Sequence, residues 1–241
     1  MQVVKRSRAL DGVIINLGNL FTVSNVDTGH GIGHALAVLD HASNALEEFD
    51  IDENQILSVK LAALLHDADD RKFFKDTQNA RDLLQDFPES VRDDAMLMID
   101  LVSCSKNGNA RGDYPLWMLI PRFADRLEAL GIIGIVRCYE YSVHTGRPMF
   151  TSDTPKCFSR EDIQAVATAE RFNKYVVCKE SISMIDHFYD KLLHLKLQTG
   201  VKYIDDCMET RHEQLVEFVL KFWKHNGTID MANYINDHLQ V

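Results

Sequence analysis

The segment Leu61-Ala-Ala-Leu-Leu-His66-Asp67-Ala-Asp-Asp70-Arg-Lys72-Phe-Phe decides the fold, because in it an apolar run ends abruptly in an imidazole, three carboxylates and two cations. Residues 56–65 are apolar on nearly every side, which predicts a helix buried in the core rather than an amphipathic surface helix. His66 and Asp67 then finish a core helix. Buried ionisable groups are costly unless they are paired or bind a metal, so this helix end is a candidate metal site. A His-Asp pair alone is also typical of an ordinary capped helix end, so further ligands must converge on it.

Two other segments supply such ligands. Asp27-Thr-Gly-His30-Gly-Ile-Gly-His34 opens a stretch of apolar residues at helical spacing, with the two histidines one turn apart if the helix extends that far back. Ile120-Pro-Arg-Phe-Ala-Asp125 places one carboxylate between apolar neighbours. Two imidazoles and two carboxylates suit manganese, iron, cobalt or nickel in octahedral geometry, with two positions left for a water and a phosphate oxygen. The four predicted ligands are His34, His66, Asp67 and Asp125.

Composition describes an ordinary globular protein. At 241 residues, with 46% hydrophobic and 26% charged residues, the chain is long enough for a large core, and a single domain over residues 1–241 is expected. A net charge of −10, spread along the chain, disfavours polymeric nucleic acid as a partner. A small phosphate remains compatible with that charge, because a local metal and a few cations outweigh a distant negative field.

Cysteine usage and hydropathy indicate the cellular compartment of the protein. The five cysteines contain no Cys-x-x-Cys pair, which indicates neither a zinc knuckle nor a disulfide framework and favours a reducing cytoplasmic location. No stretch approaches the ~18 consecutive apolar residues of a membrane-spanning helix, and the N-terminus lacks an apolar signal core. We therefore expect a cytoplasmic protein without a membrane partner.

The remaining pattern is helical throughout, with no alternating strand pattern, so the predicted fold class is all-α. The segment 106–115 is rich in turn formers and reads as a loop, as does the segment 142–159. Ser159-Arg-Glu-Asp162 resembles a capping box. Further helices are expected over residues 13–21, 77–87, 116–141 with a bend at Pro121, 179–197 and 201–224.

The order His34, then His66-Asp67, then Asp125 resembles the HD-domain superfamily of metal-dependent phosphohydrolases. Several segments are similar to its bacterial YedJ/YpgQ-like subfamily, namely Val102-Ser-Cys-Ser-Lys106, Ala124-Asp125-Arg-Leu-Glu-Ala-Leu-Gly, Gly146-Arg-Pro-Met-Phe, Phe188-Tyr-Asp-Lys-Leu-Leu-His and Thr210-Arg-His-Glu. The resemblance implies an all-helical HD-type bundle, one divalent ion, and hydrolysis of nucleoside triphosphates to monophosphate and pyrophosphate. One departure is His30-Gly31, where the subfamily commonly has His-Asp.

Proton transfer points to the residues just after the ligands. On a helix that continues past His66, Asp70 lies one turn on and faces the same cavity, which makes it the candidate general base. If the helix stops at Asp67, the faces exchange and Asp69 takes that place. Lys72 joins Asp70 as a candidate catalytic residue, because it can neutralise charge on the phosphate.

Substrate contacts are expected from scarce cations in an acidic chain. Lys106, Arg126 and Arg147 are candidates to neutralise the phosphate chain, as the transition state of phosphoryl transfer requires, and His30 is a further substrate-binding candidate. For Arg126 a structural role is equally compatible with the sequence: an ion pair with Glu128, or a contact that orients a ligand carboxylate. The loop with Arg147 is by composition typical of solvated surface, and its match to the subfamily favours substrate contact.

The other histidines carry less information. His187, Lys191 and His194 share a face between charged residues, which is typical of wet surface. No histidine lies between Asp67 and Asp125, whereas two-metal HD diesterases draw further ligands from that interval, so a single metal is expected.

The sequence thus predicts a single-domain, all-α hydrolase that binds one divalent transition metal ion, which is manganese, nickel, cobalt or iron, with magnesium as a further candidate. The favoured reaction on a small-molecule nucleotide releases pyrophosphate from a nucleoside or deoxynucleoside triphosphate. The alternatives are a nucleotidase that removes phosphate from monophosphates, a metal-bound nucleotide-sensing module without turnover, and a helical scaffold with coincidental histidines. A homo-oligomer is compatible with all of them.

Overall fold

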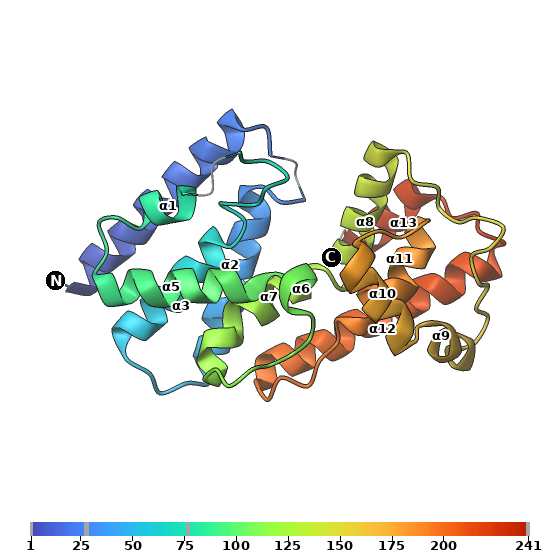
Figure 1. Cartoon of the computed structure of the whole chain (residues 1–241). Helices are drawn as coiled ribbons and strands as arrows, with labels where there is room; N and C mark the ends of the chain where they lie inside the picture. The colour runs from blue at the N-terminus through green and yellow to red at the C-terminus, as the bar shows by residue number, and fades with distance from the viewer. Residues whose placement is uncertain (1, 27–28, 76–77, 240–241) are drawn as a thin grey trace. The chain divides into compact units, whose positions relative to one another are not determined.

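The protein is all-α, as predicted (Figure 1). The structure is a computed structural model and describes residues 2–26, 29–75 and 78–239, in which no strand occurs. The chain divides into two compact units, the first of Met1–Ser103 and Ala110–Asp125, the second of Cys104–Asn109 and Arg126–Val241. The expectation of a single domain over residues 1–241 stays a prediction.

The first unit is built around α3 (Glu53–Leu65). Asp52 caps this helix in a capping box with Gln55, and residues 61–65 are completely buried on every side of it. It packs against both α2 and α5, which explains why its sequence shows no polar face. The other helices of the unit are α1 (Gln2–Val23), α2 (Ile32–Leu46), α4 (Asn79–Leu83), α5 (Glu89–Val102), η1 (Leu116–Leu119) and the first part of α7 (Ile120–Glu128).

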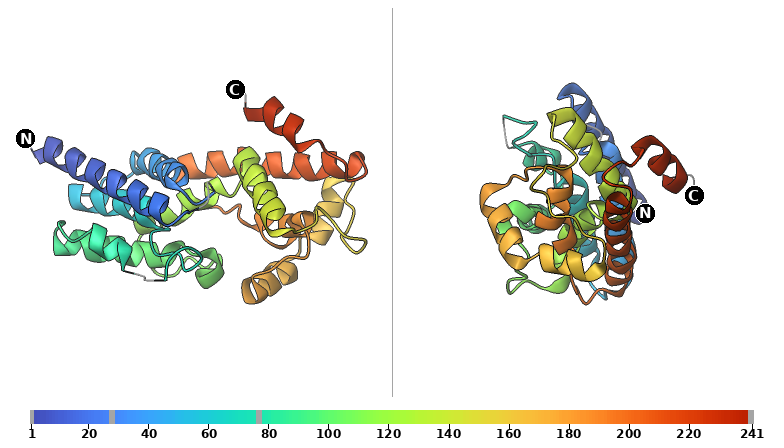
Figure 2. Two further views of the ribbon diagram at one scale, coloured as in Figure 1. Left: turned by 90° about the horizontal axis from the view of Figure 1, so that it is seen from above. Right: turned by 90° about the vertical axis from the view of Figure 1, so that its right-hand side faces the viewer.

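The second unit is organised by α12 (Lys202–Lys224), which packs against α8 (Gly131–Thr145) (Figure 2). Trp223 near the end of α12 is buried, and its Nε1–H donates to the Tyr189 hydroxyl at 2.8 Å. That hydroxyl in turn donates to the Pro155 carbonyl at 3.1 Å, so the indole and the phenol are both satisfied. The unit also contains α6 (Cys104–Asn107), α9 (Arg160–Val166), α10 (Ala169–Cys178), α11 (Met184–Asp190), η2 (Leu192–His194) and α13 (Met231–Leu239).

The predicted helix over 116–141 is divided, because residues 116–119 form the 3-10 helix η1 and the α-helix that follows is interrupted before Gly131. Gly131 has a φ of +68°, a conformation that L side chains rarely adopt. A Cβ atom at Gly134 would lie 2.2 Å from the Ala129 carbonyl oxygen, so the chain turns through a space that only glycine leaves open. The break ends α7 at Glu128, shortly after Asp125, and α8 begins at Gly131.

The predicted helix over 179–197 is also shorter than expected. Lys179 ends α10 in a left-handed conformation with a φ of +59°, and Ser183 caps α11 by accepting from the Asp186 backbone N–H. The capping box predicted at Ser159 is present and starts α9. All five cysteines are free, and none of the described helices is long and apolar enough to cross a membrane.

Candidate metal centre

The end of α3 delivers His66 and Asp67, as the sequence predicts. The helix ends at Leu65, and His66 is its C-cap residue. The His66 Nδ1 lies 2.9 Å from the carbonyl oxygen of Ala63, an arrangement in which Nδ1–H donates and the lone pair resides on Nε2. The imidazole side chain is only 2% exposed, so its orientation is set by the core of the unit. A carbonyl oxygen holding the far nitrogen is the usual support for a metal-binding histidine.

His34 and Asp125 reach the same place from α2 and α7. His34 lies in the first turn of α2, which begins at Ile32 after the extended residue Gly31, and its side chain is 3% exposed. Asp125 lies on α7 among buried neighbours, with its side chain 28% exposed. Three helices of the first unit therefore contribute to one cluster.

The distances within this cluster are short. The Nε2 atoms of His34 and His66 lie 3.1 Å apart. Asp125 Oδ1 lies 3.3 Å from the first and 3.5 Å from the second. Asp67 Oδ2 lies 3.8 Å from His34 Nε2 and 3.4 Å from His66 Nε2. The structure thus brings together all four side chains that the sequence predicts as ligands.

The electrostatics of the cluster favour a positive charge between its carboxylates. Burial lowers the pKa of His66, but the carboxylates of Asp67 and Asp125 outweigh it and raise that pKa well above its usual value. Burial raises the pKa of both carboxyls, but the imidazoles outweigh it, so that the pKa of Asp67 falls to about 2 and that of Asp125 well below its usual range. A shared proton or a divalent ion can supply the positive charge, and metal binding takes the proton's place.

The donor set fits a single divalent ion. One ligand atom each from His34, His66 and Asp67 lies within 4.8 Å of the others, which is close enough to share an ion, and Asp125 adds a fourth donor beside both imidazoles. Two nitrogen and two carboxylate donors suit manganese, iron, cobalt or nickel better than a thiolate-seeking metal. The Ala63 carbonyl that orients His66 was not identified from the sequence, although a histidine at a helix end commonly meets a carbonyl of the preceding turn.

The turn after α3 changes the setting of the two candidate bases. Of the two alternatives, the helix that continues past His66 and aligns Asp70 with it is not present, because α3 ends at Leu65, before both residues. Asp69 Oδ1 accepts from the Asn79 backbone N–H at 2.8 Å and so ties this turn to α4. Asp70 Oδ1 accepts from the Lys72 N–H at 2.9 Å, and Asp70 Oδ2 lies 3.5 Å from the Lys72 ammonium. The choice between the two carboxylates stays a prediction.

His30 lies beside the ligands, though not for the reason expected. It precedes α2, so it is not one helical turn before His34. Its ring is nevertheless edge-on to that of His34, with centroids 6.5 Å apart, and its centroid lies 5.3 Å from that of Phe73. The side chain is half-buried, and a substrate-binding role for it stays a prediction.

The other three substrate candidates belong to the second unit. Lys106 is exposed on α6. Arg126 is 1% exposed and its Nη2 donates to the Gly108 carbonyl, while Glu128, the ion-pair partner expected for it, pairs with Arg211 at 2.9 Å, so the role of Arg126 stays a prediction. Arg147 follows α8 and places its guanidinium over the Tyr141 ring, 5.1 Å from the centroid.

Comparison with known proteins places the chain beside a viral relative. It is 39% identical over 215 residues to the uncharacterized protein L803 of Acanthamoeba polyphaga mimivirus, which covers 80% of this chain and 88% of that protein. No family model matches the sequence.

Solved structures have the same fold. An HD-superfamily hydrolase from Bacillus thuringiensis matches with a TM-score of 0.65 and 21% identity, over 93% of this chain and 100% of that chain. YpgQ from Bacillus subtilis, solved in complex with ADP, matches with a TM-score of 0.64 and 20% identity, over 91% of this chain and 96% of that chain. At these identities the likeness establishes the fold, and the chemistry has to be argued from the cluster itself.

Proposed function

We propose that this chain, which belongs to one family with mimivirus protein L803 and has the fold of an HD-superfamily hydrolase, is a metal-dependent phosphohydrolase of that superfamily. The observation that carries the proposal is the convergence of His34, His66, Asp67 and Asp125 in one buried cluster. The reaction we favour is cleavage of a nucleoside or deoxynucleoside triphosphate to the monophosphate and pyrophosphate. The complex of YpgQ with ADP supports a nucleotide as the substrate class.

The four proposed ligand side chains contribute to ion binding in different ways. His66 is fixed through Ala63, so its Nε2 lone pair is presented without reorganisation. The two carboxylates keep the site anionic at neutral pH, since the pKa values of both lie low. A divalent ion held there supplies a Lewis acid for a phosphoryl oxygen and lowers the pKa of a water molecule.

Neighbouring residues complete the proposed reaction. Asp70 accepts the proton of the attacking water, because its only side-chain ion pair among the described residues is with an exposed lysine and is readily given up. That lysine, Lys72, is 62% exposed and so is available to the phosphate. Lys106 and Arg147 contact the phosphate chain, and a guanidinium can hold two phosphate oxygens at once.

A nucleotidase and a metal-bound sensing module remain the alternatives, and product identity separates all three. The purified chain, loaded with manganese, is incubated with a panel of ribo- and deoxynucleoside mono-, di- and triphosphates. We expect monophosphate and pyrophosphate from triphosphates, and loss of activity in Asp67→Asn. Orthophosphate from monophosphates would make the protein a nucleotidase. Tight nucleotide binding without any product would make it a sensor.

A further inference from the structure

Two cations of the second unit surround a histidine that the reaction proposed above does not use. His187 lies in α11, Lys191 directly follows that helix, and Arg147 follows α8, against which α11 packs. The carbonyl of Pro148, the residue after Arg147, accepts from the backbone N–H of Met184 in α11 at 2.8 Å, so Arg147 lies next to this helix, and its charge and that of Lys191 both act on the His187 ring. The two cations are thus directed at one region of this unit.

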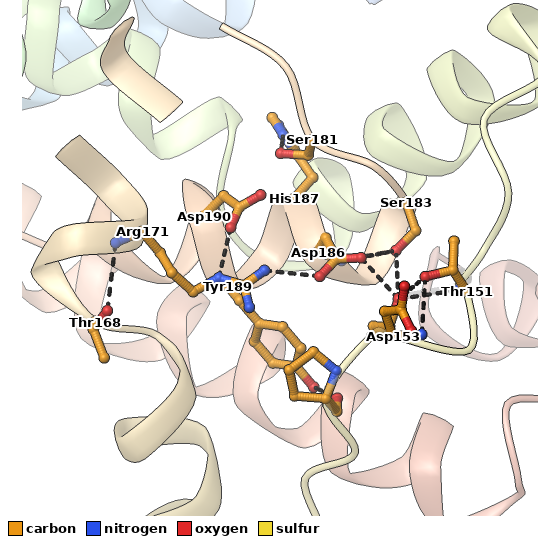
Figure 3. Close-up of polar contacts among 12 residues, drawn as sticks. Thr151, Asp153, Thr168, Arg171, Ser181, Ser183, Asp186, His187, Tyr189 and Asp190 are labelled. Carbon is orange, nitrogen blue, oxygen red and sulfur yellow. Dashed lines mark hydrogen bonds and ion pairs between the residues drawn. The ribbon is translucent and has the colours of Figure 1, made fainter. Parts of the chain in front are cut away.

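The two carboxylates of α11 form ion pairs with a different cation. Asp186 and Asp190 lie one helical turn apart and both bind Arg171 of α10, at 2.7 Å each (Figure 3). Asp186 also accepts from the hydroxyls of Thr154 and Ser183 at 2.8 and 2.7 Å. Among the ion pairs of the described residues, neither carboxylate is paired with Lys191, although Asp190 is its neighbour in the chain. Both carboxylates of α11 are therefore paired with Arg171.

Aromatic rings hold the two cations without using their hydrogen-bond donors. The Lys191 ammonium lies 5.6 Å from the centroid of Tyr175, and the Arg147 guanidinium lies 5.1 Å from that of Tyr141. A ring face attracts a cation but leaves its N–H groups available to an oxygen ligand. Within the described part of the chain, neither side chain has an ion pair or a side-chain hydrogen bond.

His187 adds a polar but uncharged surface between them. Its Nδ1 lies 3.3 Å from the Ser181 hydroxyl (Figure 3). Its ring also meets that of Tyr175 edge-on, with centroids 5.3 Å apart. Burial and the two cations lower the pKa of His187 well below its usual value, so the ring is neutral at pH 7. The wet surface expected for His187 and Lys191 is therefore not what the structure contains.

We propose that Arg147, Lys191 and the Ser181–His187 pair form a binding site for a phosphate group. A phosphate dianion matches two positive charges, whereas a carboxylate would match only one. Serine and arginine offer it directed donors, and the lysine supplies a mobile ammonium. Among these residues only Arg147 takes part in the proposed function, and the site requires no metal.

Pyrophosphate binding to the full chain without metal tests this proposal. Titration calorimetry in the presence of a chelator is combined with NMR of the His187 ring. We expect saturable binding that shifts the ring signals of His187, and an affinity about 10-fold or more lower in Lys191→Met, because one charge-assisted contact is lost. Lys191→Arg should retain binding. Lys174→Met, which removes an exposed lysine of α10, is the charge-matched control. Absence of saturable binding, or an equal loss in the control, would overturn the proposal.

Nucleotide kinetics then identify the source of the phosphate. If KM for a nucleoside triphosphate rises in Lys191→Met while kcat is kept, the bound group belongs to the substrate. If pyrophosphate binding falls and KM is unchanged, the ligand is free phosphate or pyrophosphate. If the chain hydrolyses no nucleotide yet loses pyrophosphate binding in Lys191→Met, the site stands and the proposed function fails.

Discussion

Replacing Asp67 by Asn probes the charge balance of the metal centre most directly. The carboxylate is 19% exposed, and its pKa falls from 3.8 to about 2 because the imidazoles outweigh the effect of burial. At about 1.4 kcal/mol per pH unit this corresponds to about 2 kcal/mol of stability in the protein without metal. Asn keeps the shape and removes the charge, so Asp67→Asn should be less stable by about that amount.

The sign of the effect with pH follows from the two partners. A carboxyl with a lowered pKa contributes stability above pH 3.8, and the contribution is lost as the pH falls towards 2. His66, whose pKa is raised, contributes below pH 6.5, and that contribution is lost as the pH rises through its raised pKa. The difference between the wild type and Asp67→Asn should therefore be largest between these limits and shrink in more alkaline solution.

Urea unfolding followed by far-UV circular dichroism, with a chelator present, measures this difference at about pH 5.5 and about pH 10. Asp50→Asn removes an exposed carboxylate of the same unit and serves as the control. Added manganese should then stabilise the wild type and the control but not Asp67→Asn. A stability loss of the same size at both pH values, or stoichiometric metal retained by Asp67→Asn, would refute the reasoning.

Three further predictions concern the turn, the cations and the glycine break. Asp70→Asn should keep the metal but slow hydrolysis by about 10²–10⁴-fold, and a silent Asp70→Asn with a slowed Asp69→Asn would transfer the proton role. Lys106→Ala and Arg147→Ala should lower kcat/KM for four nucleoside triphosphates alike, whereas loss for one base alone would indicate base contact. Gly134→Ala should lower the free energy of unfolding by about 1–3 kcal/mol in urea, and an unchanged midpoint would contradict the tight approach.

The place of His66 and Asp67 in the candidate cluster was predictable because it depends on residue type at the end of an obviously buried run. Residues 61–65 are apolar on all sides, so whatever ended them had to be paired or bind a metal. The point at which α3 ends was not predictable. Residues 66–70 contain neither Gly nor Pro, and no local rule stops a helix there. Asp69 accepts from Asn79, ten residues further on, and His66 lies beside Asp125 of α7, so the turn makes contacts that no local pattern reveals.

The glycine break shows a different limit. Gly131 and Gly134 are visible in the sequence, and two glycines are as compatible with a softened helix as with an interrupted one. The close approach of the Ala129 carbonyl to Gly134, and of Gln214 to Gly131, selects the interruption. Gln214 comes from α12, some eighty residues later, so its influence cannot be read from the local pattern.

Charge balance is the property for which sequence pattern fails most clearly. The chain as a whole has a net charge of −10, and α11 carries two carboxylates, Asp186 and Asp190. Arg171, fifteen and nineteen residues before its two partners, engages both carboxylates of that helix. What is left around His187 is a positive region in an acidic protein. The order of charges along the sequence cannot predict this region, because the packing of α10 on α11 decides which cation pairs with which carboxylate.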